Sequence, residues 1–298
     1  MRGTGLFGDK ALDPAKLLPA TITPSYGLYG DYVGGILGTL ISAVTLIVVW
    51  LTWRATSKAQ RVQGVLAVVA EMLKTHDAVA GSGENSFWSR SGTPSAMLRE
   101  FSAVYEQTRA VVPEDTIWST GDRIDIAYTF TFYGLSSNAT DALSSYGEDR
   151  IRRVSNAVSE LRYREGRYKE LFKGHQTTVS QYMRNLFNIY SFIAGSAISS
   201  KDKYAISKIV RAKLSNYEQA VLALNIMSHL GAEWEYRGLV EKFKPFANIP
   251  KRFYGFDDGF SLKDRFPSLE FEWEGEAGRR PRYFPIRLGR MSLTLAIY

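Results

Sequence analysis

The clearest pattern in the chain is a long apolar run near its N-terminus. Residues 32–53, YVGGILGTLISAVTLIVVWLTW, hold 22 positions without a charge, and Asp31 and Arg54 bound them. A helix of this length measures about 33 Å, against about 30 Å for the hydrocarbon core of a bilayer. Its hydroxyl side chains can bond back to the helix backbone, and aromatic residues stand near both ends, as in membrane proteins. The pattern predicts a transmembrane helix over 32–53.

A cleaved signal peptide is the alternative reading of this run. Such a peptide joins a basic N-terminal region to a short apolar stretch and a small-residue cleavage site. Here the run begins late, and three basic residues follow it: Arg54, Lys58 and Arg61. The N-terminal side carries Lys16 and little else nearby. Because basic flanks stay in the cytoplasm, we expect a retained anchor with 1–31 outside the cytoplasm and 54–298 inside it.

Small residues form two lines along the predicted span. One line is Gly34, Gly38 and Ser42, and the other is Gly35, Thr39 and Ala43. Small residues four apart let two membrane helices approach closely, which predicts a homo-oligomeric interface. The alternative is that glycine is simply commoner in membrane helices than in soluble ones.

Beyond the span, apolar positions recur mainly at helical spacing. The pattern predicts helices over 54–79, 96–110, 148–171, 177–194 and 204–230, and a loop over 81–95. Residues 122–135 alternate in a strand-like way, and we interpret them as a helix because of the resemblance described below. The expected fold is mainly α, with one N-terminal transmembrane helix followed by a cytoplasmic helical domain. Four parts are expected: an extracytoplasmic segment 1–31, the span 32–53, the helical domain 54–250, and an irregular basic tail 251–298.

The predicted helices 177–194 and 204–230 carry many polar residues. A linker with one glycine and several serines separates them, so we expect the two helices to pair antiparallel. Folding about residue 199 brings Arg184 opposite Glu218, where an ion pair is sterically possible. Such a pair would either fix the helix register or take part in catalysis, and buried charges need partners in both cases.

Charge and composition exclude several classes of protein. Lys and Arg number 37 against 30 Asp and Glu, which gives a net charge of +7. The chain has no cysteine and three histidines, so a disulfide scaffold, a thiol nucleophile and a multi-histidine metal centre are not expected. Phosphate-binding, dinucleotide-binding, zinc-protease and serine-hydrolase motifs are also absent from the sequence. We therefore expect no cofactor and no metal, and name no catalytic residue.

Basic residues concentrate at the C-terminal end. The last twenty positions hold five arginines and no acid: Arg279, Arg280, Arg282, Arg287 and Arg290. This tail is either a loosely ordered end or a segment that contacts anionic lipid or nucleic acid. Basic residues exceed acids only 8 to 5 over 148–174, which favours a solvated helix face over an RNA-binding stripe. Direct nucleic-acid binding is not expected.

Several segments resemble a known family. The run YGDYVGGILGTLISAVTLIVVWLT resembles the N-terminal membrane segment of the phage abortive infection proteins, an AbiC-like family. The runs GHQTTVSQYMRNLFNIYSFI at 174–193 and YAISKIVRAKLSNYEQAVLALN at 204–225 resemble two helices of that family, and AYTFTFYGL at 127–135 is also similar. The positions that match the family's motifs are His175, Tyr182, Arg184, Asn185, Arg211, Ser215, Tyr217, Glu218 and Asn225.

The resemblance implies bacterial anti-phage defence by abortive infection, similar to the retron-associated membrane effectors. It implies a toxin-like effector in the bacterial inner membrane, with the lipid bilayer, further copies of the chain, and a phage trigger or a reverse transcriptase with its noncoding DNA or RNA as partners. One alternative is a membrane-tethered ribonuclease of the HEPN type, suggested by Arg184-Asn185. In that case the expected histidine is missing, and His175 would have to replace it. A non-toxic membrane scaffold is the other alternative.

Overall fold

The computed structural model describes residues 23–80, 94–113, 117–164, 172–251, 253–254, 260–276, 284–288 and 291–295. The chain divides into two units, Met1–Gln60 and Arg61–Tyr298. Residues 81–93 of the predicted loop 81–95 lie outside the described residues. Most of the arginines of the predicted tail lie outside them too.

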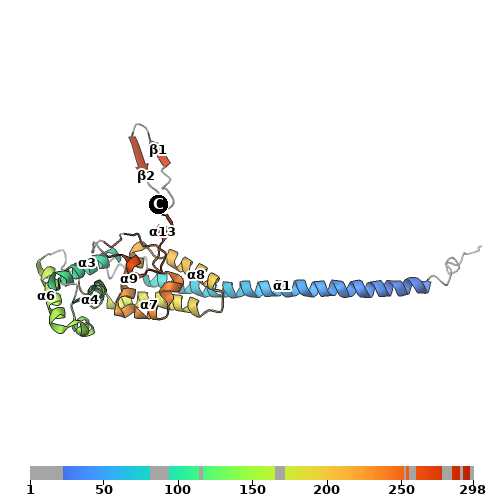
Figure 1. Ribbon diagram of the computed structural model, residues 1–298, viewed down its shortest axis with the longest axis horizontal. Helices are drawn as coiled ribbons and strands as arrows, with labels where there is room; N and C mark the ends of the chain where they lie inside the picture. The colour runs from blue at the N-terminus through green and yellow to red at the C-terminus, as the bar shows by residue number, and fades with distance from the viewer. Residues whose placement is uncertain are drawn as a thin grey trace, which may run out of the picture. The chain divides into compact units, whose positions relative to one another are not determined.

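The fold is mainly α, as predicted (Figure 1). The long helices are α1 (Thr23–Ala80), α3 (Pro94–Val111), α4 (Thr120–Tyr133), α6 (Glu148–Arg164), α7 (Gln176–Gly195), α8 (Ser200–Ala212) and α9 (Asn216–Met227). The short ones are α5 (Ser137–Ala142), η2 (Ser144–Tyr146), η4 (His229–Gly231), α10 (Ala232–Tyr236), α11 (Leu239–Phe243), α12 (Leu262–Arg265) and α13 (Glu272–Glu276). An antiparallel pair of strands, β1 (Phe284–Leu288) and β2 (Met291–Leu295), pairs Phe284 with Leu295.

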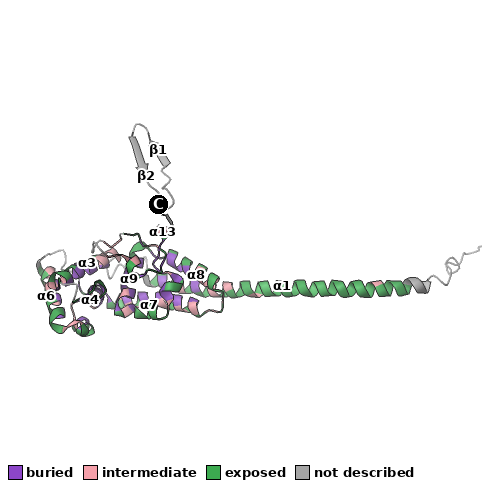
Figure 2. Ribbon diagram, in the orientation of Figure 1, coloured by how far each residue is buried: buried purple, intermediate pink, exposed green. Residues whose placement is uncertain are grey.

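The first unit contains the predicted span. The apolar side chains of 28–53 are exposed on every side of α1 (Figure 2). Thr39, Thr45 and Thr52 each donate a hydrogen bond to the carbonyl four residues earlier, at 2.7–2.8 Å. This satisfies their hydroxyl groups inside the helix, as hydrocarbon requires. Among the described helices, α1 alone is long and apolar enough to cross a membrane, with a mean hydropathy of 2.2 over its most apolar window.

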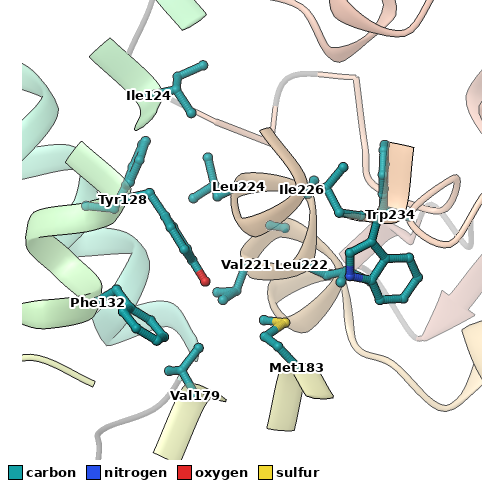
Figure 3. Packing of buried hydrophobic residues seen from close by; sticks show 14 of the residues in the cluster. Ile124, Tyr128, Phe132, Val179, Met183, Val221, Leu222, Leu224, Ile226 and Trp234 are labelled. Carbon is teal, nitrogen blue, oxygen red and sulfur yellow. The ribbon is translucent and has the colours of Figure 1, made fainter. Parts of the chain in front are cut away.

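The second unit has a single hydrophobic core. Helix α3 packs against α4, α6 and α9, and α4 packs against α9 and α7. Figure 3 shows the centre of this core, where Tyr128 and Phe132 from α4 lie near Val179 and Met183 from α7 and Leu224 from α9. Residues 123–132 of α4 are all buried because other elements surround the helix, so its apolar residues are not confined to one face. A capping box of Ser119 and Asp122 starts it.

The sequence-based prediction of one helix over 204–230 is wrong. The structure has two helices, α8 and α9, with a break at 213–215. Ser215 caps α9: its hydroxyl accepts a hydrogen bond from the Glu218 amide at 3.2 Å, and the Glu218 carboxylate accepts from the Ser215 amide at 2.8 Å. The first amide groups of a helix have no partner within that helix, and this reciprocal cap supplies partners for two of them. It therefore marks the start of a new helix.

The predicted irregular tail, 251–298, also differs from the structure. It contains α12, α13 and the two strands. Leu262, Phe266, Leu269 and Phe271 are buried in the core of the second unit. The amide of Glu272 donates to the carbonyl of Ala247 at 3.0 Å. A boundary at residue 250 therefore cuts through packed structure, because buried apolar side chains of 262–271 belong to the same core.

Candidate functional site

His175 anchors the start of α7. Its ring Nε2 lies 3.1 Å from Glu100 Oε2, and both side chains are buried. Its amide donates to the carbonyl of Phe132 at 2.8 Å. The backbone approaches closely here: a Cβ on Gly174, which has a φ of +84°, would meet the carbonyl carbon of Tyr133 at 2.6 Å. The residue thus ties α7 to α3 and α4, and its ring is held by Glu100.

Three of the predicted motif residues form one cluster with a histidine of α1. The Tyr182 hydroxyl donates to Glu218 Oε1 at 2.9 Å, and Glu218 Oε2 accepts from the Ser215 hydroxyl at 2.8 Å. The ring of His76 lies 4.4 Å from the ring of Tyr182, centre to centre. We call His76, Tyr182, Ser215 and Glu218 the Tyr182 cluster.

The electrostatics of this cluster keep the phenol protonated. Burial raises the pKa of Tyr182 well above its ordinary value, and the neighbouring Glu218 carboxylate raises it further. The phenol therefore stays protonated and donates its hydrogen bond to the Glu218 carboxylate. His76 is 2% exposed, and among the described residues its Nδ1 has no hydrogen-bond partner. The cluster thus holds a buried polar atom whose hydrogen-bonding capacity is unused.

Lys213 adds a second link between the α8–α9 junction and α1. Its ammonium lies 3.2 Å from Asp77, next to His76, and both side chains are about half exposed. Leu73 and Val69, one and two turns earlier in α1, are buried in the same core. The stretch 61–80 of α1 is therefore held by apolar packing, a ring contact and an ion pair.

The predicted ion pair between Arg184 and Glu218 is wrong. Glu218 is bound to Ser215 and Tyr182, whereas Arg184 is exposed, and among the described residues it has no ion-pair partner. Successive helix residues are about 100° apart, so Arg184 lies about 200° around α7 from Tyr182. Because Tyr182 faces Glu218, Arg184 faces the solvent on the other side of α7.

Arg211 is a buried cation with a structural position. It is 4% exposed, and its guanidinium donates to the carbonyl of Lys244 at 2.9 Å and lies 3.8 Å from Glu272. Lys244 ends α11 in the left-handed conformation, with a φ of +50°. Arg211 thus connects α8 to the end of α11 and to α13, and the charge is balanced as a buried cation requires.

The nine predicted motif residues do not gather at one point. Tyr217 is half exposed, with its ring 5.1 Å from that of Phe253, and Asn185 is half buried. Asn225 is buried against Gly231, where an added Cβ would meet the Asn225 carbonyl at 2.2 Å. The span residues Gly34, Gly35, Gly38 and Ser42 lie on the exposed surface of α1. Among the described residues, and apart from the adjoining helix backbone, nothing lies within 4 Å of a Cβ built on any of these three glycines.

A cleft of about 350 Å³ brings Arg184 and Asn225 together. Helix α7 forms one wall and the α9–α10 region the other, with the end of α4 between them. The lining residues are Phe132, Tyr133, Gln176, Ser180, Met183, Arg184, Phe187, Asn225, Leu230, Gly231, Glu233 and Trp234. We call this the α7–α10 cleft.

The structure also shows an Asp–His pair that the sequence did not indicate. The Asp125 carboxylate accepts from His229 Nδ1 at 2.8 Å, from the His229 amide at 2.9 Å and from the Tyr146 hydroxyl at 2.8 Å. Burial alone would raise the pKa of Asp125, but the bonds from His229 and Tyr146 hold it below its ordinary value. The bond to Asp125 raises the pKa of His229, with partial burial opposing it. The pair joins α4, η2 and η4.

The residues present do not indicate a metal site. In the part of the chain that the structure describes, no group of three His, Asp or Glu residues is placed to hold a metal ion. The ribonuclease interpretation also gains nothing from the geometry, because His175 is buried against Glu100 and Arg184 is exposed two turns later on α7.

Comparison with known protein families gives a match to the helical segment that contains the nine motif residues. Residues 174–254 match the family model described as Putative phage abortive infection protein. This confirms the predicted resemblance over α7 to α11, a segment that includes all nine motif residues, and it supports a general role in phage abortive infection. The N-terminal run YGDYVGGILGTLISAVTLIVVWLT and the stretch 127–135, which also resemble the family, lie outside the matched residues. No curated protein and no solved structure matches the chain.

Proposed function

We propose that this chain, a relative of the phage abortive infection proteins over residues 174–254, is a membrane-anchored anti-phage effector. Residues 32–53 cross the bacterial inner membrane, and the chain from Arg54 onward lies in the cytoplasm. The positively charged flank of Arg54, Lys58 and Arg61 supports this orientation. Once infection is sensed, the effector oligomerises and damages the membrane.

The observation that carries this proposal is the Tyr182 cluster. The matched segment supplies Tyr182, Ser215 and Glu218, and α1 supplies His76. The helix that contains the apolar span thus ends, within the second unit, against the residues that define the family resemblance. A signal that shifts α7 relative to α9 changes the packing around His76 and the adjoining turn of α1. This gives the signal a physical route to the anchor helix.

The oligomer forms through the small-residue lines of the span. Gly34, Gly38 and Ser42 are exposed, and within the described part of the chain no side chain comes within 4 Å of a Cβ built on either glycine. Backbones can approach closely along such a line, which permits van der Waals packing between helices in lipid. The trigger is a phage component or a defence-system partner such as a reverse transcriptase with its noncoding nucleic acid.

The test compares two phenols of the matched segment in bacteria challenged with phage. Tyr182→Phe removes the hydroxyl that binds Glu218 and keeps the ring beside His76. Tyr217→Phe is the matched control, because that tyrosine is half exposed and the described contact of its side chain is a ring contact with Phe253. We expect Tyr182→Phe to lose phage protection and the loss of membrane potential reported by a dye, and Tyr217→Phe to keep both.

Two results would count against the proposal. Protection without any change in membrane potential would separate defence from membrane damage. Equal protection by both variants, at equal protein levels, would show that the Tyr182–Glu218 bond has no part in the response.

A further inference from the structure

The α7–α10 cleft combines an aromatic wall with a polar row. Gln176, Ser180 and Arg184 are spaced four apart on α7, so they line one edge of the cleft over about 12 Å. Met183 and Phe187 form the adjacent row of the same helix. The volume, about 350 Å³, lies at the lower end of the range of pockets that hold small molecules, about 300–1,000 Å³.

The apolar part of the cleft is lined by aromatic rings. Trp234 lies on the opposite wall, with its ring 5.6 Å from that of Phe187 and edge-on to it. At the end of α4, the rings of Phe132 and Tyr133 meet edge to face at 4.9 Å. Figure 3 shows Phe132 and Trp234 reaching toward Met183 from opposite sides of the core. Aromatic walls of this kind favour a flat ring as ligand, because ring faces stack.

The polar part is cationic at one position. Glu233 is 2.8 Å from Arg237 Nε, and the Arg237 guanidinium also lies 5.1 Å above the Phe187 ring, so these two charges balance each other. Arg184 has no ion-pair partner among the described residues. A guanidinium with its donors unoccupied is suited to a phosphate, which it can bind with two parallel hydrogen bonds.

Two amide side chains complete the set. Gln176 lies at one end of the polar row and Asn225 in the opposite wall, where it is 5% exposed. Amide groups both donate and accept, and they match the paired donor and acceptor edges of nucleobases. From these features we propose that the α7–α10 cleft binds a nucleoside monophosphate, with the base against the aromatic wall and the phosphate on Arg184.

The charge of the cleft favours a single nucleotide over a nucleic-acid strand. Strand binding requires a row of cations that follows successive phosphates. The cleft residues Arg184 and Glu233, together with Arg237 beside them, sum to one positive charge. The volume is also small for more than one nucleotide. The proposal concerns this cleft alone and does not depend on membrane damage.

Calorimetric titration of the full chain in detergent with the four ribonucleoside 5′-monophosphates tests the proposal. We expect saturable binding of at least one of them. For that nucleotide, the matching nucleoside and ribose 5-phosphate should each bind at least about tenfold more weakly, since one lacks the phosphate and the other the ring.

Variants of two cleft residues test whether the nucleotide binds in the cleft. Arg184→Ala should weaken binding about tenfold or more, and Arg184→Lys less, because a lysine keeps the charge but loses the bidentate geometry. Glu233→Gln should tighten binding about threefold, since it removes a carboxylate near the phosphate. The matched control is Arg152→Ala, an exposed arginine on α6 paired with Asp149, which should bind as wild type does.

Three results would overturn the assignment. Absence of binding by all four nucleotides would remove the ligand class. Ribose 5-phosphate binding as tightly as the nucleotide would remove the aromatic contribution. Wild-type affinity in Arg184→Ala would place the nucleotide elsewhere on the chain.

Discussion

Two parts of the same helix use apolar residues in opposite ways. In the first unit, the uncharged stretch of α1 from Tyr32 to Trp53 has apolar side chains on all sides, and they are exposed, with Val44 at 59%. In the second unit, apolar residues of α1 lie mainly on one side and pack into the core, with Val69 at 0% and Leu73 at 5% exposed. The first pattern suits a surrounding of lipid, and the second suits a protein core with water on the other side. Hydrophobicity alone therefore does not identify a core position; the distribution around the helix does.

The largest expected effect comes from placing charges in the exposed apolar part. Val44→Arg together with Val48→Arg puts two cations near the middle of the span, at about 2.5–3.5 kcal/mol each in a membrane helix. We expect the protein to leave the carbonate-resistant membrane fraction.

The matched control is Gly64→Arg with Val68→Arg. These positions are also four apart and exposed on α1, and no described residue beyond the local helix comes within 4 Å of a Cβ on Gly64. Fractionation of this control should equal wild type. If the two double variants fractionate alike, the two parts of α1 do not differ in their surroundings.

The next prediction concerns stability. It changes the buried part of α1 and uses the exposed part as the control. Leu73→Ala should lower the free energy of unfolding of the second unit by about 2–5 kcal/mol, because it leaves a cavity in a packed core. Leu46→Ala, at a position 70% exposed, should leave that free energy unchanged. Denaturant unfolding, monitored by hydrogen exchange of the α7 amides, measures the free energy of unfolding of both variants. Equal losses of stability in the two variants would contradict the packing described here.

Much of the fold follows from the sequence, and so does part of the site. The uncharged run of 32–53 and the helical spacing in 177–194 identified α1 and α7 because both patterns are local. The break between α8 and α9 was missed, although the spacing of Ser215 and Glu218 is that of a capping box and was visible in the sequence. His76 could also have been found, since it continues the buried line of Val69 and Leu73 at helical spacing.

Other features had no local signal. Asp125 and His229 are 104 positions apart, and their contact depends on how α4 packs beside α9. The cleft residues Arg184 and Asn225 come together for the same reason, through tertiary packing. The predicted contact of Arg184 with Glu218 failed because Arg184 lies on the exposed side of α7, whereas Tyr182 faces Glu218.

The smallest expected effect is a pH dependence of stability, and it arises from the contact between Asp125 and His229 within the second unit. The folded-state pKa of His229 is raised, so its ion pair with Asp125 stabilises fully below about pH 6.5, the unfolded value, and the stabilisation is lost as pH rises through the folded pKa. The pKa of Asp125 is lowered, so its contribution is present above about pH 4 and is lost as pH falls through the folded value.

Asp125→Asn tests this sign. The stability difference between wild type and this variant should shrink as pH rises from about 6 to 9, by about 0.5 kcal/mol, because the 41% exposed histidine is screened by solvent. Asp149→Asn, an exposed acid paired with Arg152, should show no such trend. A difference that grows with pH would show that the His229 pKa is not raised by Asp125.

The central claim is that α1 anchors the chain with its helical unit in the cytoplasm, and one labelling experiment tests it directly. The chain has no cysteine, so single cysteines can be introduced at the exposed positions Gly27 and Tyr163. Spheroplasts are treated with a maleimide that does not cross the inner membrane, before and after lysis. We expect Gly27→Cys to be labelled in intact spheroplasts and Tyr163→Cys to be labelled after lysis alone. Labelling of Tyr163→Cys in intact spheroplasts would contradict the account.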